Sequence, residues 1–122
     1  MATVVKIPAQ IKNVKDKHIS EYFGFVATKQ KNLSVALMTT QAGWEEEPQT
    51  AKFDEYIFVI SGVLYVKTKG DDHIIRANEA IEIKKGEIVQ YCTPFTSGAV
   101  YLSICLPAFR PILVKQSTIK KQ

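Results

Sequence analysis

The stretch FDEYIFVISGVLYV, residues 53–66, decides the fold class. Its two apolar runs are rich in β-branched and aromatic residues, which is typical of strands that pack against a core. The pair Ser61-Gly62 separates the runs, and KGDD, residues 69–72, follows as a turn signature. We therefore predict two strands, residues 55–60 and 63–68, joined by a tight turn.

Glu55 is the most informative residue in this stretch. Side chains alternate along a strand, so Ile57 and Val59 share the face of Glu55, and the opposite face carries Tyr56, Phe58 and Ile60. Both faces are apolar, so we predict that both are covered. A carboxylate in an apolar interior is costly unless it is paired or hydrogen-bonded, which makes Glu55 a candidate for a specific role.

The rest of the chain is predicted to be short strands separated by Asn, Gly or Pro, which indicates an all-β sandwich or small barrel. The expected strands are residues 22–28, 33–40, 73–76, 80–83, 88–92 and 99–105, with KQKN connecting the first two. Only residues 11–23 have apolar residues at helical spacing, and that segment is either a helical turn or an extended arm.

Three regions are expected. Residues 1–29 are an N-terminal arm with strands, residues 30–110 are the barrel, and residues 111–122 are a basic tail. The two prolines around Ala-Phe-Arg after Leu106 favour an extended tail that lies over the barrel or a partner subunit. Arms at both ends favour a homodimer.

Composition excludes several classes of protein. The chain has 122 residues and a mass of 13.7 kDa, which fits one domain. The net charge of +4 comes from the ends, without aromatic residues interleaved among the lysines, so we expect no nucleic-acid partner. No apolar run approaches the roughly 18 residues of a membrane span, and no apolar secretory core is present, so we expect a cytoplasmic protein without a membrane partner. Cys92 and Cys105 are expected to be buried, reduced thiols.

Two motifs resemble those of the cupin superfamily, including its RmlC-like members. Glu55 followed by Gly62 resembles the end of the first cupin motif, and NEAIEIKKGEIVQY, residues 78–91, resembles the second. Asn78 stands where that motif has a glycine, and Asn is the non-Gly residue that best tolerates a positive φ. The resemblance implies a conserved cupin barrel, an antiparallel double-stranded β-helix or jelly roll.

The metal ligands of that superfamily are largely missing. The resemblance places Gln49, Ala51 and Val89 where other cupins have histidines, and only Glu55 remains of the four ligands. The chain has two histidines in all, His18 and His73, and neither lies in the motifs. We therefore expect no metal and no cofactor, although a metal held by carboxylates around Glu55, or shared across a dimer, stays open.

A narrower resemblance is to the ethanolamine-utilisation protein EutQ and related small cupins. In that group the second-motif histidine gives way to an aliphatic residue, an aromatic follows two positions later, and a Thr-Pro pair precedes the last strand. Val89, Tyr91 and Thr93-Pro94 match those features here. The sequence offers no Gly-rich phosphate loop and no basic side chain expected near Glu55, so phosphate chemistry is not expected.

Two functions remain open. The first is a metal-independent small cupin that binds a small polar metabolite, with Glu55 as a hydrogen-bonded structural carboxylate or as the acid or base of an isomerase, epimerase or lyase. The residues expected to line its cavity are Trp44, Glu47, Gln49, Tyr91 and Tyr101. The second is a non-catalytic dimeric sensor or interaction module whose barrel is filled by apolar side chains.

Overall fold

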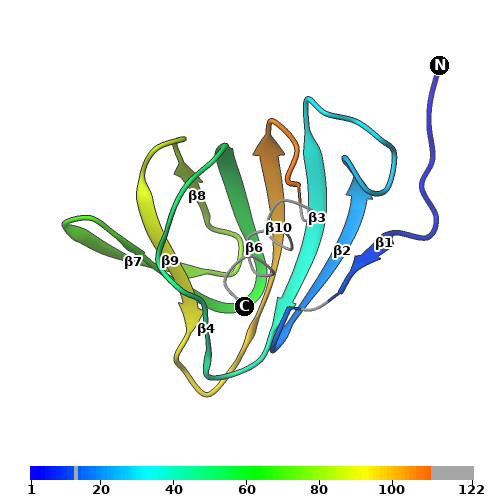
Figure 1. The fold of residues 1–122 in the computed structure, drawn as a ribbon. Coiled ribbons are helices and arrows are strands. Elements are labelled where there is room, and N and C mark those ends of the chain that lie inside the picture. The colour runs from blue at the N-terminus through cyan, green and yellow to red at the C-terminus, as the bar shows by residue number, and fades with distance from the viewer. Residues whose placement is uncertain (13, 111–122) are drawn as a thin grey trace, which may run out of the picture.

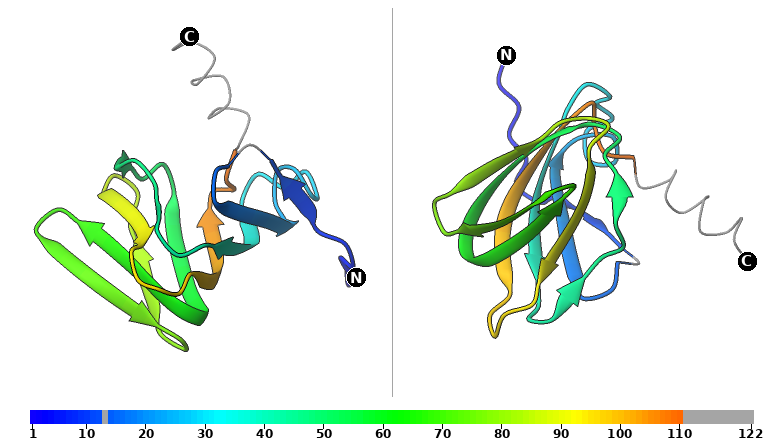
Figure 2. Two further views of the ribbon diagram at one scale, coloured as in Figure 1. Left: turned by 90° about the horizontal axis from the view of Figure 1, so that it is seen from below. Right: turned by 90° about the vertical axis from the view of Figure 1, so that its left-hand side faces the viewer.

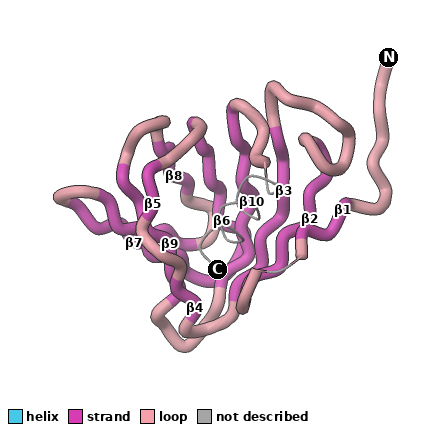
Figure 3. The backbone as a smooth tube through the Cα atoms, in the orientation of Figure 1, coloured by secondary structure: helices cyan, strands magenta, loops and turns pink. Residues whose placement is uncertain are grey.

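The computed structural model describes residues 1–12 and 14–110. These residues form ten β-strands and no helix, which confirms the predicted all-β class (Figure 3). It follows that the described residues contain no helix of the length and apolarity needed to span a bilayer. The predicted basic tail, residues 111–122, lies outside the described residues.

The strands form one curled antiparallel sheet, an open half-barrel (Figures 1 and 2). Its main path runs β1 (Ala9–Ile11), β2 (Lys17–Phe23), β3 (Ser34–Thr40), β10 (Ala99–Leu106), β6 (Asp54–Thr68), β9 (Ile88–Thr93) and β4 (Trp44–Glu45). Off this path, β5 (Gln49–Thr50) pairs with β9, and β7 (Asp71–Arg76) and β8 (Ala80–Ile83) pair with β6.

The longest strand, β6, joins the two halves of the fold. Its first part pairs with β8 and β10, and its second part pairs with β7 and β9. The predicted turn at Ser61-Gly62 is therefore wrong, because the chain continues through it as one bent strand. Gly62 has a φ of +78°, and a Cβ there would collide with the carbonyl oxygen of Gly98. Glycine is needed here for a bend and a close approach of two strands.

The structure decides between the alternatives for the N-terminal segment and corrects one predicted strand. The extended alternative is supported where the segment is described, because β1 and β2 pair with each other as antiparallel strands. The predicted strand at residues 22–28 ends at Phe23, because the buried Glu21 carboxylate accepts hydrogen bonds from the amides of Val26 and Ala27 at 2.9 and 2.8 Å. A carboxylate that satisfies two amides of a turn holds the chain out of the sheet.

The remaining strand predictions are confirmed to within two residues. The turn before β7 has Gly70 at a φ of +91°, and Asn78 has the expected positive φ, +69°. Cys92 and Cys105 are free and buried, as expected.

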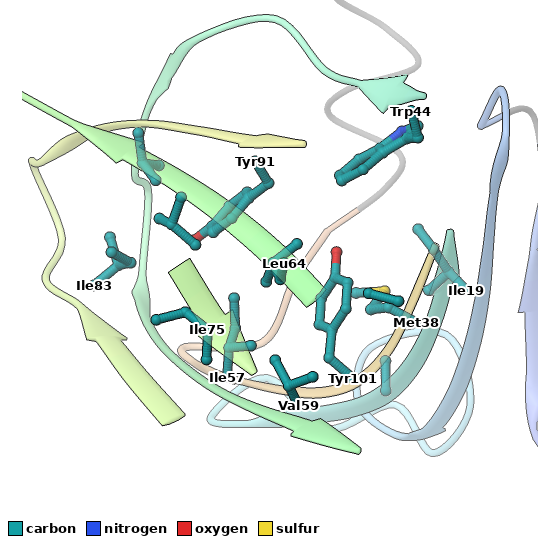
Figure 4. Packing of buried hydrophobic residues seen from close by; sticks show 14 residues of the cluster. Ile19, Met38, Trp44, Ile57, Val59, Leu64, Ile75, Ile83, Tyr91 and Tyr101 are labelled. Atoms are coloured by element: carbon teal, nitrogen blue, oxygen red, sulfur yellow. The ribbon is translucent and has the colours of Figure 1, made fainter. Parts of the chain in front are cut away.

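The core lies on the concave side of the half-barrel (Figure 4). The alternation predicted for β6 is confirmed, since Ile57 and Val59 are buried inside. The opposite face is not covered by the described residues, since Tyr56, Phe58 and Ile60 are 38%, 42% and 47% exposed. The other large side chains buried inside are Ile19, Met38, Trp44, Leu64, Val66, Ile75, Ile83, Val89, Tyr91 and Tyr101.

Candidate functional site

Glu55 lies at the start of β6 and is held by two hydroxyl groups from neighbouring strands. The hydroxyl of Tyr91 on β9 donates to one carboxylate oxygen at 2.8 Å, and the hydroxyl of Ser103 on β10 donates to the other. Tyr91 and Ser103 are buried, because their positions alternate with outward-facing residues on their strands. An ionised carboxylate has about four acceptor positions, so Glu55 keeps capacity for a further donor.

Lys17 and Glu46 form a second polar pair near Glu55, and all three residues are partly buried. The ammonium nitrogen of Lys17 on β2 is 3.7 Å from a carboxylate oxygen of Glu46, and the side-chain amide of Gln49 donates to the other oxygen at 2.6 Å. The side chains of Lys17 and Glu46 are 11% and 20% exposed. Together with Glu55 and its partners, this pair forms a polar cluster, which we define as Lys17, Glu46, Glu55, Tyr91, Tyr101 and Ser103.

Two aromatic rings border the cluster at Lys17. The Lys17 nitrogen lies 4.8 Å from the centre of the Trp44 ring and 5.9 Å from that of Tyr101. Figure 4 shows the hydroxyl groups of Tyr91 and Tyr101 directed into the interior, with Trp44 above Tyr101. Cation–π contacts of this kind stabilise a partly desolvated ammonium group.

The surroundings of Lys17, Tyr91 and Tyr101 raise their pKa values, so these three groups keep their protons at pH 7. Burial lowers the pKa of Lys17, but attraction to Tyr101, Glu46 and Glu55 outweighs it, so the net pKa is raised. Burial, together with the negative charge of Glu55, raises the pKa of Tyr101 to about 12 despite the opposing effect of Lys17, and burial also raises that of Tyr91. Lys17 is thus a cation and both tyrosines are neutral donors at pH 7.

The pKa of Glu46 is also raised, which for a carboxyl group favours the neutral form. Burial raises the pKa of Glu46, the nearby Lys17 lowers it, and repulsion from Glu55 raises it again, with a net upward shift. With both carboxylates ionised the cluster has one positive and two negative groups, and protonation of Glu46 makes it neutral. Such a set of donors and acceptors matches a neutral, hydroxyl-bearing molecule better than a strongly charged anion.

The structure brings some of the predicted site residues together and separates others. Glu55, Tyr91, Tyr101 and Trp44 all border the interior polar cluster. Gln49 is exposed and reaches the cluster only through its hydrogen bond to Glu46, while Glu47 is exposed on the surface loop. The residue of the acidic run that faces the cluster is Glu46, not Glu47.

Lys17 is the residue of the candidate site that sequence reasoning missed. The expectation that no basic side chain lies near Glu55 is wrong, because β2 brings Lys17 across the sheet from 38 positions earlier in the chain. The alternation Lys17, Ile19, Glu21 carried the signal, since Ile19 and Glu21 are both buried on the inner face. Because a helical turn was one of the two alternatives for this segment, the strand alternation of Lys17, Ile19 and Glu21 was not considered.

The side chains at the cupin metal positions do not fit a transition metal. Gln49 is paired in register with Val89, and its amide group donates to Glu46. Ala51 and Val89 have no donor atom in their side chains, which leaves Glu55 as the single carboxylate at these four positions. The described residues hold no group of three or more His, Cys, Asp or Glu that could bind a metal ion. Imidazole or several carboxylates would be needed.

Solved structures define the class of fold. An RmlC-like cupin from Shewanella frigidimarina superposes with a TM-score of 0.74 at 12% identity, covering 90% of this chain and 93% of that one. An ethanolamine utilization protein Q (EutQ) from Salmonella typhimurium superposes with a TM-score of 0.65 at 22% identity, covering 76% of this chain and 71% of that one. The chain therefore has the cupin fold, and the expected likeness to EutQ is confirmed at the level of the fold.

Sequence comparisons add one relative. No protein-family model matches the chain. The chain is 36% identical over 104 residues to the endoribonuclease YbeY of Myxococcus xanthus, a match that covers 85% of this chain. The same match spans only 35% of the length of that relative. The name of the relative describes a protein about three times as long as the matched region.

Proposed function

We propose that the chain is a metal-independent small cupin that binds a small hydroxyl-bearing metabolite at the polar cluster. The observation that supports this most is the placement of Lys17, Glu46 and Glu55 on the concave face of a half-barrel whose interior is mostly apolar. Buried charged groups lower stability unless they are well paired, and they concentrate at functional sites. The ligand approaches from the side of Lys17 and Glu46, whose side chains are partly exposed.

Each part of the cluster has a role in this proposal. The carboxylate of Glu55, fixed by Tyr91 and Ser103, accepts a hydrogen bond from a ligand hydroxyl. Lys17 donates a hydrogen bond to a ligand oxygen, which replaces its 3.7 Å contact with Glu46. Trp44 and Tyr101 offer apolar ring faces to the carbon skeleton of the ligand. Proton transfer is the chemistry that the same groups can support, with Glu55 as the base.

The alternative is a dimeric sensor or interaction module without a ligand in the barrel. Its support is the packing of the interior, where apolar side chains fill most of the concave side. The name of the Myxococcus relative does not favour a nuclease role here, because the matched region is about a third of that protein.

Thermal shift with a defined panel tests the proposal. The panel is glycerol, erythritol, ribose, glucose, glycolate and glycerate, each at 10 mM, about the level at which weakly bound small ligands are detected. We expect at least one compound to raise the Tm of the wild type, and we expect Glu55→Gln and Lys17→Met to lose that rise. Tyr65→Phe is the matched control, because its hydroxyl bonds to Asp72 outside the cluster. No shift with any compound would favour the module.

A further inference from the structure

The polar cluster contains more negative than positive groups. Glu46 and Glu55 are both carboxylates, and among the described residues Lys17 is the one cation that pairs with a carboxylate of the cluster. The other members are hydroxyl groups, which add donors but no charge at pH 7. Water screens charges in a partly buried setting only weakly. With both carboxylates ionised, an additional cation is therefore favourable here and an additional anion is unfavourable.

Contacts that do not involve Lys17 fix Glu46 in position. Glu46 lies between β4 and β5, which both pair with β9. Its backbone amide donates to the carbonyl of Tyr91 at 3.2 Å, and its own carbonyl accepts from the side chain of Gln90 at 2.8 Å. The side-chain amide of Gln49 donates to one carboxylate oxygen at 2.6 Å. The carboxylate of Glu46 therefore stays in place when Lys17 turns toward another acceptor.

The contact of Lys17 with Glu46 is the weakest part of this arrangement. Its 3.7 Å exceeds the roughly 2.7–2.9 Å of a charge-assisted hydrogen bond. The lysine side chain is long and flexible, and the hydroxyl of Tyr101, a residue only 1% exposed, is directed into the interior next to it (Figure 4). When Lys17 donates to a ligand oxygen, Glu46 keeps the amide of Gln49 but loses its cation, and a partly buried carboxylate without a cation is costly.

We propose that the ligand of the polar cluster is a small primary amine that also bears a hydroxyl group, and that its ammonium group replaces Lys17 as the partner of Glu46. This inference rests on the proposed function, because it requires a hydroxyl-bearing ligand in the cluster. The ligand hydroxyl lies between Lys17 and Glu55. The ring of Trp44 lies 4.8 Å from the Lys17 nitrogen and offers the same cation–π contact to the ligand ammonium.

The exchange of partners ranks three classes of hydroxyl-bearing ligand. A hydroxy acid adds a third carboxylate beside Glu46 and Glu55, and like charges repel strongly in a partly buried setting. A neutral polyol avoids this repulsion but leaves Glu46 without a cation once Lys17 has turned. An amine with a hydroxyl group gives every charged group a partner. The predicted order of affinity is therefore the amine first, the polyol second and the hydroxy acid last.

Isothermal titration calorimetry of the full chain with ligands of matched size tests the proposal. Serinol, glycerol and glycerate share a three-carbon skeleton and differ in having an ammonium group, no charge or a carboxylate. Glucosamine and glucose form a second pair. Phosphate buffer at pH 7 is needed, because Tris is itself a hydroxyl-bearing amine. We expect the wild type to bind at least one amine with a Kd at least about tenfold lower than that of its neutral counterpart, as for one bond to a charged group.

Two variants of the same loop identify the carboxylate that makes the difference. Glu46→Gln keeps the shape of the side chain and removes its charge, so the amine is expected to bind no tighter than its neutral counterpart. Glu47→Gln is the matched control, because it removes the same charge from the exposed neighbouring residue, and we expect it to keep the preference of the wild type. Far-UV circular dichroism checks the fold, and Glu46→Ala is the second variant if Glu46→Gln does not keep the strand signal.

The outcomes separate this proposal from the proposed function. Binding of the neutral compounds with an affinity equal to that of the amines would overturn the proposal and leave the proposed function standing. A preference for the amine that persists without the charge of Glu46, or that is lost in Glu47→Gln, would also overturn it. If no compound of either set binds the wild type, the proposed function and this proposal fail together.

Discussion

The hydrogen bond between Glu55 and Tyr91 should contribute to the free energy of unfolding by an amount typical of a bond to a charged group. The perturbation is a double-mutant cycle of Glu55→Gln and Tyr91→Phe. The hydroxyl of Tyr91 donates to the carboxylate at 2.8 Å in a largely buried setting. A hydrogen bond to a charged group contributes about 1.5–3 kcal/mol and a neutral one about 1 kcal/mol. The amide of the variant keeps a neutral bond at most, so the expected coupling energy is about 1 kcal/mol.

Urea unfolding at pH 7 measures each corner of the cycle. With a urea m-value of roughly 1–3 kcal/mol/M, a coupling of this size shifts the midpoint by several tenths of a molar. Tyr65→Phe combined with Glu55→Gln is the control pair, because Tyr65 bonds to Asp72 at a separate surface site and the two changes should add. A coupling between Glu55 and Tyr91 below about 0.3 kcal/mol, which is the range of independent sites, would refute the geometry on which the cluster rests.

Three further predictions concern the cluster and the bend of β6. Tyr101 has a pKa of about 12 in the fold against 10.0 for the free side chain, so the folded state holds its proton more tightly and loses stability as the pH rises from about 10 to 12. This group should account for a loss of about 3 kcal/mol in the free energy of unfolding. Urea titrations at pH 9 and pH 12 should show this loss in the wild type and not in Tyr101→Phe. The same loss in both proteins would show that Tyr101 is not buried beside negative charge. Lys17→Met should lower the free energy of unfolding by roughly 1–3 kcal/mol at pH 7, because it leaves Glu46 without its cation. Without Lys17 the pKa of Glu46 rises further, so this deficit should shrink as the pH falls toward 4.5 and Glu46 takes up a proton, and a deficit independent of pH would contradict the pairing. Gly62→Ala should prevent folding or cost at least about 3 kcal/mol, because its Cβ meets the backbone of Gly98, while Gly70→Ala, also at positive φ but with open space around it, should cost only about 1–2 kcal/mol; similar losses in thermal unfolding would argue against the close approach.

The strands were predictable where local chemistry and the fold agree. Alternation identified the inward set of β6, and Gly70 and Asn78 sit at positive φ as their turn contexts indicated. The turn at Ser61-Gly62 failed because a glycine required by a strand crossing has the same local sequence signal as one required by a hairpin. Only the contact with Gly98, 36 positions away, distinguishes the two.

The site was predictable in part for a similar reason. Glu55 stood out because it is a carboxylate in an apolar strand, and Tyr91 followed from its parity with Val89. Lys17 did not stand out, because a lysine in a charged N-terminal segment has no local feature that separates it from solvated lysines. Its contact with Glu46 depends on the pairing of β2 with β3 and on the fold of the loop after β3.

Isothermal titration calorimetry tests the central claim most directly. The wild type and Glu55→Gln would be titrated with the compound of the panel that gives the largest thermal shift, or with each compound in turn if none does. The account predicts a saturable heat for the wild type and a Kd at least tenfold weaker for Glu55→Gln, which is the loss of about one hydrogen bond to a charged group. No saturable heat with any compound, or the same Kd for both proteins, would contradict the claim that the polar cluster is a ligand site.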